Sequence, residues 1–462
     1  MNLEDTIVAI STPIGESGIG IVRMSGKNAF FIAKKLFVPA RTNQISWTSS
    51  FKIYYGWIMD PETKERVDEV LLSLMRAPRT YTREDIVEIN CHGGPVVLRR
   101  VLELCLKLGA RLAEPGEFTK RAFLNGRIDL SQAESVLEIV KAKTEKSLQL
   151  AVKSLEGRVS NLILTLRDKI IDVLSALEAE IDFCEEEIEV ISRKEKGLIL
   201  SQIERELSEL VENARSSEIF REGIKVVIAG RPNVGKSSLL NSMLQRERVI
   251  VSQIPGTTRD TIEEYINIKG FPVKMVDTAG LGKTEDPLAE EGAKRTRHYL
   301  EEADIIIALV DGSCPLTDED REILELLKEY KKKILPVINK IDLPQKICKD
   351  ELKKLFPQTT PLEISALRGD NLEGLKNEIL NLILKDVNVD SDQLMINLRQ
   401  KKCLEKAQEF ITKAREGLNL GVSEEFLILD IREALKYLDQ ITGRNLGDEV
   451  LDRIFSNFCI GK

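Results

Sequence analysis

Eight consecutive residues near the middle of the chain have the types and spacing of a phosphate-binding loop. Residues 230–237 read Gly-Arg-Pro-Asn-Val-Gly-Lys-Ser, which matches the pattern G-x-x-x-x-G-K-S. In such a loop, glycines let backbone N–H groups converge on phosphate oxygens. Lys236 would carry a cation toward the β- and γ-phosphates, and the Ser237 hydroxyl can coordinate Mg²⁺. The stretch therefore predicts a binding site for a nucleoside triphosphate with Mg²⁺.

Two segments that follow the loop can complete the contacts with the metal and the γ-phosphate. They read Gly-Thr-Thr-Arg-Asp at 256–260 and Asp-Thr-Ala-Gly at 277–280. Thr258 can complete the coordination of Mg²⁺, Asp277 can hold the metal through water, and the Gly280 amide can reach the γ-phosphate. Segments of this kind change conformation with the nucleotide, so they predict a switch as well as a site.

Two further segments predict which base is bound. They are Asn-Lys-Ile-Asp at 339–342 and Ser-Ala at 365–366. The Asp342 carboxylate can accept hydrogen bonds from N1–H and the exocyclic amine of guanine, and Asn339 and the 365–366 backbone would complete the pocket. Adenine would leave buried polar groups unpaired, which gives a discrimination of roughly 10⁴–10⁵. The ordered set of motifs therefore predicts GTP as the ligand.

The elements that must position these segments alternate between strands and helices. Charged helical stretches separate apolar runs that predict strands of a parallel sheet, at 225–229, 304–310, 334–338 and 362–365. One exception is a hairpin made of residues 261–268, a Lys269-Gly270 turn and residues 272–276. It places one antiparallel strand at the edge of the sheet.

The sequence on either side of this unit has a different texture. The first 120 or so residues mix short strands with a helix, and the stretch from about 127 to 217 is leucine-rich and helical, with Ser131 and Glu134 predicted as a capping box at its start. Helical sequence returns after 385, where apolar residues recur at spacings of four and three, namely Leu427, Ile431, Ala434, Leu438 and Ile441. We therefore expect four segments, with the nucleotide-binding one inserted between two helical halves: 1–120, 121–219, 220–384 and 385–462.

Composition limits the classes of function. The 462 residues are 42% hydrophobic and 31% charged, which predicts a globular protein of roughly three domains. Because the net charge is −8, any contact with a polyanion such as RNA would be local or shared with a partner. No apolar run approaches the 18 or so residues of a membrane span. With only two histidines, the sequence argues against histidine-based triads and multi-histidine metal centres. Scattered cysteines without a secretory segment predict a cytoplasmic protein.

Several stretches outside the nucleotide motifs carry a resemblance to a known family. Together with those motifs, Gly93-Gly94, the segment from Pro115 to Leu130 and the closing Phe-Cys-Ile-Gly-Lys at 458–462 resemble the tRNA modification GTPase MnmE (TrmE) family over the full length. The resemblance implies an amino-terminal α+β domain that binds folate and dimerises, a discontinuous helical domain, and an inserted Ras-like P-loop GTPase domain. The last would hold a mostly parallel sheet with one antiparallel edge strand.

The resemblance also implies a reaction and its partners. With an FAD-containing protein resembling MnmG, such a homodimer adds an aminomethyl or carboxymethylaminomethyl group to C5 of the wobble uridine of certain tRNAs. The one-carbon unit would come from 5-formyl- or 5,10-methylene-tetrahydrofolate, and GTP hydrolysis would drive the cycle. The residues implied to contact GTP are Asn233, Val234, Gly235, Lys236, Ser237, Ser238, Ser252, Gln253, Ile254, Pro255, Gly256, Thr257, Thr258, Asp277, Thr278, Ala279, Gly280, Asn339, Lys340, Asp342, Ser365, Ala366 and Leu367.

Members of this family use K⁺ in place of an arginine finger, with G domains that pair face to face. The positions that match the K⁺ ligands are Asn233, Ser252, Ile254 and Thr257. A cation beside the β/γ bridge would stabilise the charge that develops there, as a finger does at roughly 10³–10⁵ in rate, or about 4–7 kcal/mol. From the sequence alone, Asn233 is equally well an ordinary loop residue.

The catalytic residues depart from the family in one place. Leu281 stands where many GTPases have a water-positioning Gln, and the position of the family's glutamate is Ala289. Glu290 is the favoured substitute, with Glu285, Glu291 or slower hydrolysis as alternatives. Lys236 and Thr258 complete the predicted catalytic set for GTP hydrolysis.

The predicted folate contacts, also by resemblance, are Arg23, Glu88, Arg127 and Lys462. A carboxylate such as Glu88 can pair with the amino-pyrimidine edge of a pterin, while the cations can meet the glutamate tail or the formyl oxygen. Taken singly, each of these residues is typical of ordinary surface charge. Cys459 has either a mechanistic role beside this site or the role of a packed thiol that anchors the tail.

Two alternative functions use the same motifs. One is a GTP-switched assembly factor, for example in ribosome maturation, which would need no one-carbon chemistry. The other is a folate-dependent aminomethyltransferase that works without GTP. The amino-terminal segment and the tail distinguish the first from the tRNA modification hypothesis, and a Lys236→Ala variant distinguishes the second.

Overall fold

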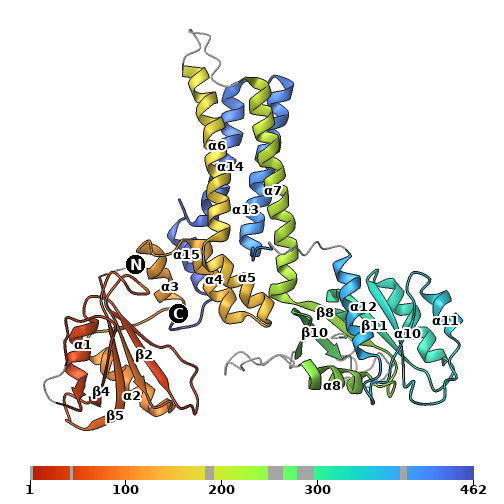
Figure 1. The fold of residues 1–462 in the computed structure, drawn as a ribbon, viewed down its shortest axis with the longest axis horizontal. Coiled ribbons are helices and arrows are strands. Elements are labelled where there is room, and N and C mark those ends of the chain that lie inside the picture. Colours follow the sequence, from red (N-terminus) through yellow and green to blue (C-terminus); the bar gives the residue numbers. More distant parts are fainter. Residues whose placement is uncertain (1–3, 42–44, 183–191, 248–263, 278–295, 386–392) are drawn as a thin grey trace.

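The computed structural model describes residues 4–41, 45–182, 192–247, 264–277, 296–385 and 393–462. They form two units built on sheets and a long bundle of helices, and the two sheet units flank one end of the bundle (Figure 1). The carboxyl-terminal tail returns to the amino-terminal sheet, where the Gly461 carbonyl accepts a hydrogen bond from Arg23. The two ends of the chain therefore build one region together.

The amino-terminal unit is a seven-stranded sheet with the order β3-β4-β5-β6-β2-β1-β7. All neighbouring strands are antiparallel except β1 and β7. The strands are β1 (Ile7–Ile10), β2 (Gly20–Ser25), β3 (Phe37–Pro39), β4 (Lys52–Met59), β5 (Arg66–Met75), β6 (Ile86–Cys91) and β7 (Arg111–Leu112). Helices α1 (Ala29–Leu36) and α2 (Pro95–Lys107) bury their apolar residues against this sheet in one core.

Four long helices, α6, α7, α13 and α14, make the bundle, and four shorter ones connect it to the amino-terminal unit. The bounds are α3 (Glu117–Leu124), α4 (Leu130–Lys141), α5 (Glu145–Leu155), α6 (Arg158–Asp182), α7 (Arg193–Glu222), α13 (Leu398–Leu420), α14 (Glu424–Thr442) and α15 (Asp448–Phe455). The apolar repeat predicted for α14 is confirmed, since its five residues are all buried in the bundle core. Among the helices that the structure describes, none combines the length and apolar character that a membrane crossing needs.

The predicted cap of α4 was wrong. Asp129 caps this helix: its side chain accepts a hydrogen bond from Gln132 N (2.9 Å), and the Gln132 side chain accepts one from Asp129 N (3.0 Å). Ser131 is buried within the first turn, and Glu134 is turned toward Arg399 of α13, 2.7 Å away. Two capping-box spacings overlap here: D-x-x-Q from Asp129 and S-x-x-E from Ser131. The ion pair draws Glu134 toward α13, so the first spacing forms the cap.

The third unit is a six-stranded sheet with the order β13-β12-β11-β8-β10-β9. Its strands are β8 (Ile224–Ala229), β9 (Glu264–Ile268), β10 (Phe271–Asp277), β11 (Ile305–Asp311), β12 (Lys333–Asn339) and β13 (Leu362–Glu363), and the described helices around them include α8 (Lys236–Glu247), α10 (Asp318–Glu329), α11 (Lys349–Leu355) and α12 (Leu372–Leu384). Every pairing is parallel except β9 with β10. The prediction of a parallel sheet with one antiparallel edge strand is confirmed.

The bundle and the third unit are joined without a linker on one side. Helix α7 ends at Glu222 and β8 begins at Ile224, with only Gly223 between them (Figure 1). Phe220 of α7 and Leu150 of α5 belong to the same hydrophobic core as the strands of this sheet. The orientation of the third unit is therefore fixed by packing as well as by the chain connection.

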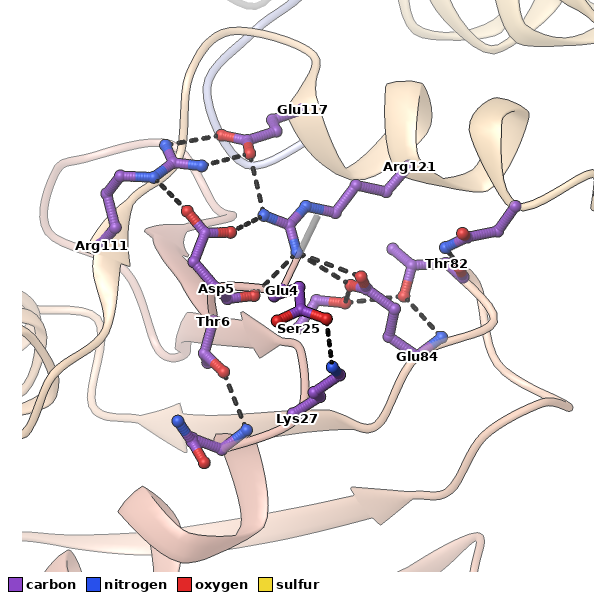
Figure 2. A network of polar contacts seen from close by, with 12 residues as sticks. Glu4, Asp5, Thr6, Ser25, Lys27, Thr82, Glu84, Arg111, Glu117 and Arg121 are labelled. Atoms are coloured by element: carbon purple, nitrogen blue, oxygen red, sulfur yellow. Dashed lines mark hydrogen bonds and ion pairs between the residues drawn. The ribbon is translucent and has the colours of Figure 1, made fainter. Parts of the chain in front are cut away.

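A network of charges around the buried side chains of Arg121 and Glu117 fastens α3 to the amino-terminal sheet (Figure 2). The Arg121 side chain is 0% exposed and donates hydrogen bonds to Asp5, Glu84 and Glu117. Arg111 pairs with the same Asp5 (2.6 Å) and Glu117 (2.6 Å). These contacts hold β1, α3 and the loop before β6 in one arrangement.

Candidate functional site

The phosphate-binding loop connects β8 to α8, which is the strand-loop-helix order that the motif requires. Asn233 and Gly235 both have positive φ, at 65° and 103°. A Cβ on Gly235 would lie 2.3 Å from Asn339 Nδ2, so only glycine fits at this close approach. This backbone shape turns successive N–H groups toward one point, which suits an anion.

Lys236 is held inside the loop. It is 8% exposed, and its ammonium donates hydrogen bonds to the carbonyls of Gly230 (2.8 Å) and Arg231 (3.1 Å). Burial lowers the pKa of Lys236, while the nearby Asp277 carboxylate raises it. The negative phosphates of a nucleotide would add to that second effect and keep the lysine charged.

Two of the three predicted Mg²⁺ ligands are in contact. Ser237 Oγ donates a hydrogen bond of 2.6 Å to Asp277 Oδ2, which brings the start of α8 to the end of β10. Asp277 Oδ1 is buried and has no hydrogen-bond partner among the described residues. An orphaned carboxylate oxygen beside a serine hydroxyl fits a hard cation with water in its shell. Thr258, the third ligand, lies outside the described residues.

The base-binding residues meet at the carboxyl end of the same sheet. Asn339 is 2% exposed; its Nδ2 donates to the Val234 carbonyl (2.8 Å) and its Oδ1 accepts from Ala366 N (2.9 Å). Asp342 accepts a hydrogen bond of 2.6 Å from Ser365 Oγ, which lowers the pKa of this carboxyl. The carboxylate is therefore charged and oriented, as recognition of guanine requires. The predicted contact Leu367 is 83% exposed beside it.

Lys340 links the base-binding segment to the phosphate-binding loop. Its ammonium donates to the Asn233 carbonyl (2.9 Å) and to Asp311 Oδ2 (2.6 Å). Asp311 was missed by the sequence reasoning. The feature that could have indicated Asp311 is its position: it is the last residue of an apolar strand, beside the strand that ends at Asn339. In a parallel sheet such residues converge at the edge where ligands bind.

Part of the predicted site lies outside the residues that the structure describes. The predicted residues that lie outside the described part of the chain are Ser252, Gln253, Ile254, Pro255, Gly256, Thr257, Thr258, Thr278, Ala279, Gly280, Ala289 and Glu290, together with the alternatives Glu285 and Glu291. The K⁺ ligand set is therefore represented by Asn233 alone, and the identity of the water-orienting residue stays a prediction.

A second candidate site is a cavity of about 340 Å³ between the amino-terminal sheet and helices α4 and α5. Its polar lining includes Arg23, Glu88 and Lys462, which are three of the four predicted folate contacts. The rest of the lining is Tyr81 and a set of apolar residues: Met75, Ile86, Val136, Ile139, Val140 and Leu155. The cavity thus combines charged residues from the sheet and tail with apolar residues from helices α4 and α5 and from strands β5 and β6.

The charged face is organised by two neighbouring strands. Arg23 of β2 and Glu88 of β6 are register partners, and their side chains form an ion pair of 2.7 Å. Arg23 also binds the Gly461 carbonyl (3.2 Å), which brings the last residues of the chain to the cavity. The sheet register therefore explains why residues 65 positions apart share one site.

Arg127 and Cys459 do not line the cavity. The Arg127 guanidinium lies over the ring of Tyr81, 4.8 Å from the ring centroid. Tyr81 itself lines the cavity, so Arg127 lies behind this lining residue. Tyr81, whose hydroxyl is 2.9 Å from Thr119 Oγ1, was not predicted because an aromatic residue in a loop carries no distinctive signal. Cys459 is exposed, and buried Phe458 packs against Phe455 instead, so the hypothesis of a packed thiol is wrong.

The fold and the nucleotide site define a P-loop GTPase with two attached units. The family profile described as "MnmE helical domain" matches residues 130–459, and the one described as "GTP-binding protein TrmE N-terminus" matches residues 6–127. The chain belongs to the MnmE family of tRNA modification GTPases, and it is a GTPase that works with GTP and Mg²⁺.

Relatives that bear the family name match this chain over its length. The protein named tRNA modification GTPase MnmE from Thermoanaerobacter pseudethanolicus is 48% identical over 459 residues, covering 99% of each chain. The protein of the same name from Carboxydothermus hydrogenoformans is 47% identical over 468 residues, covering 100% of each.

Proposed function

We propose that this GTPase uses a folate one-carbon unit to build an aminomethyl or carboxymethylaminomethyl group on C5 of the wobble uridine of certain tRNAs. The observation that carries the proposal is the cavity in which Arg23, Glu88 and Lys462 face an apolar wall. Two relatives that match the full length of the chain are named as tRNA modification GTPases. An FAD-containing partner resembling MnmG would share the tRNA and complete the reaction.

The cavity suits a reduced folate in size and in chemistry. Its volume of about 340 Å³ is in the range of small-molecule sites. Glu88 can accept hydrogen bonds from the amino-pyrimidine edge of a pterin, Arg23 and Lys462 can meet carboxylate or formyl oxygens, and the helical wall can cover an aromatic spacer. When bound, the folate supplies the one-carbon unit as 5-formyl- or 5,10-methylene-tetrahydrofolate.

The third unit, called the G unit from here on, would work as a dimer that a K⁺ ion completes. Asn233 is the described member of the proposed ligand set, which otherwise comprises Ser252, Ile254 and Thr257. Its carbonyl accepts a hydrogen bond from the Lys340 ammonium, and we propose its side-chain oxygen as the K⁺ ligand. K⁺ would supply positive charge near the β/γ bridge in place of an arginine finger.

Each segment then has a proposed role in a cytoplasmic homodimer. Residues 1–120 bind folate and dimerise, 121–219 and 385–462 form the helical domain with the tail, and 220–384 hydrolyse GTP. The buried joint between α7 and β8 supports a stiff connection, through which hydrolysis can move the helical domain.

Binding of 5-formyl-tetrahydrofolate to the full-length protein tests the folate site. Glu88→Gln removes the charged acceptor, and hydrogen bonds to charged groups contribute about 1.5–3 kcal/mol, so we expect a dissociation constant raised roughly 10- to 150-fold. Glu16→Gln, at an exposed position of the same unit, is the matched control and should bind as the wild type does. A wild-type protein that fails to bind the folate would overturn the proposal.

A further inference from the structure

One short helix connects the G unit to the second cavity. Helix α5 runs from Glu145 to Leu155, and at a rise of 1.5 Å per residue it is about 16 Å long. Its last residue lines the cavity of the proposed folate site. Its first turn lies against the hairpin formed by β9 and β10. The same rigid element therefore contacts two sites that belong to different units.

The contact with the hairpin is specific at the level of single atoms. Thr144, the N-cap of α5, donates a hydrogen bond of 2.8 Å from Oγ1 to the Gly270 carbonyl at the turn. The Lys146 ammonium lies 4.8 Å from the ring centroid of Phe271 and 5.2 Å from that of Phe220, and the two rings are stacked at 4.9 Å. Gly270 has φ of 91°, and a Cβ there would lie 3.3 Å from Lys146, so the two elements fit closely.

The other end of β10 reaches the nucleotide site. Asp277, its last residue, accepts the hydrogen bond from Ser237 of the phosphate-binding loop. A strand of seven residues at about 3.3 Å each spans roughly 23 Å. From Ser237 to Leu155, therefore, the route consists of one strand and one helix that pack against each other at the hairpin.

At the cavity, α5 is hydrogen-bonded to α4, which supplies the rest of the helical wall. Gln132 Nε2 of α4 donates a hydrogen bond of 2.8 Å to the Leu155 carbonyl. The wall residues Val136, Ile139 and Val140 belong to that same α4. A displacement of α5 would therefore shift the helical part of the apolar lining relative to Arg23 and Glu88, which are fixed on the sheet.

We propose that α5 couples the two sites, so that the nucleotide bound at Ser237 and Asp277 sets the affinity of the cavity for its ligand. The inference rests on the proposed function, since it concerns the regulation of the proposed folate site. Mg²⁺ held through water at Asp277, next to a γ-phosphate, would displace the end of β10. The Thr144 and Lys146 contacts would transmit the displacement to α5, and the wall carrying Leu155 would open or close. Such coupling is reciprocal, so folate also changes the affinity for the nucleotide.

The test compares the dissociation constant of 5-formyl-tetrahydrofolate for the full-length protein with Mg²⁺ and either GDP or a non-hydrolysable GTP analogue. For the wild type we expect the two constants to differ by roughly 5- to 150-fold. Thr144→Val and Lys146→Ala should bring this ratio close to one while changing the constant with GDP little. Thr144→Ser keeps the hydroxyl and should keep the ratio. Gln149→Ala, on the exposed side of the same helix, is the matched control.

Each outcome points to a different conclusion. If neither nucleotide state binds the folate, the proposed folate site is overturned and the coupling with it. If the wild type binds equally well in both states, the coupling is overturned and the folate site stands. If the ratio persists in both variants, α5 is not the route. Should Thr144→Val fail to fold for loss of its cap, Lys146→Ala still decides the matter, because that change leaves the cap intact.

Discussion

Removal of the buried guanidinium of Arg121 should destabilise the amino-terminal unit far more than removal of an exposed one. Arg121 donates to Glu84 at 3.1 and 3.2 Å and to Glu117 at 3.1 Å, and its side chain is 0% exposed (Figure 2). Arg121→Met keeps much of the apolar stem but leaves these carboxylates without their shared cation. Breaking a buried pair in this way costs about 3–5 kcal/mol.

The structure places the expected loss at the lower end of that range. Arg111 still binds Glu117 (2.6 Å) and Asp5 (2.6 Å), and Ser25 still donates to Glu84 (2.7 Å). We therefore expect a loss of about 3 kcal/mol in the free energy of unfolding of this unit. With a urea dependence of about 1–3 kcal/mol per molar, the midpoint should fall by roughly 1–3 M.

Tryptophan fluorescence during urea unfolding measures this loss in the right unit, because the chain has two tryptophans, Trp47 and Trp57, and both lie in the amino-terminal unit. The control is Arg79→Met at an exposed position, which should change stability by less than about 0.5 kcal/mol. If Arg121→Met moved the midpoint no further than this control, the reasoning about uncompensated buried charge would be refuted.

Further predictions concern acid stability, base selection and hydrolysis. Burial raises the pKa values of Asp5 and Glu117, but hydrogen bonds from two arginines outweigh it and hold both below the usual carboxyl range. The stabilisation by these two carboxylates is therefore complete above their unfolded-state pKa and is lost as pH falls through their folded-state pKa. The urea midpoint followed by tryptophan fluorescence should therefore fall below about pH 4. A urea midpoint that stays unchanged at lower pH would contradict this. Asp342→Asn should weaken GDP binding roughly 10²- to 10⁴-fold in equilibrium titrations, since two hydrogen bonds to a carboxylate are lost, whereas exposed Asp350→Asn should not. Glu290→Ala should lower K⁺-stimulated kcat roughly 10²- to 10⁴-fold, and an unchanged kcat would remove that assignment.

The parallel sheet of the third unit was predictable because its information is local. Strands such as β11 (Ile305–Asp311) are buried at every position, so they read as continuous apolar runs. Lys269-Gly270 marks the hairpin directly, since both residues have positive φ in the structure. The nucleotide motifs follow strand ends, so the sheet topology alone brings Asn339 to the phosphate-binding loop.

Features that depend on packing between distant elements were not predictable from the sequence. The cap of α4 lies at Asp129 because Glu134 is drawn into an ion pair with Arg399, 265 residues away. The helical wall of the second cavity consists of ordinary apolar residues. Their periodic spacing in the sequence predicts only that they are buried in a core, and it does not indicate that they line a cavity. The contact between Asp311 and Lys340 could not be predicted without the register of β11 against β12, which places Asp311 beside Asn339.

The most direct test of the account is the nucleoside composition of tRNA from cells that lack this gene, measured by mass spectrometry after complementation with the wild type, Lys236→Ala or Glu88→Gln. We predict that the modified wobble uridine disappears on deletion and returns with the wild type. It should not return with Lys236→Ala, which lacks the phosphate-binding cation, and it should return to a lower level with Glu88→Gln, which lacks the proposed folate acceptor. Normal wobble-uridine modification in the deletion strain would contradict it.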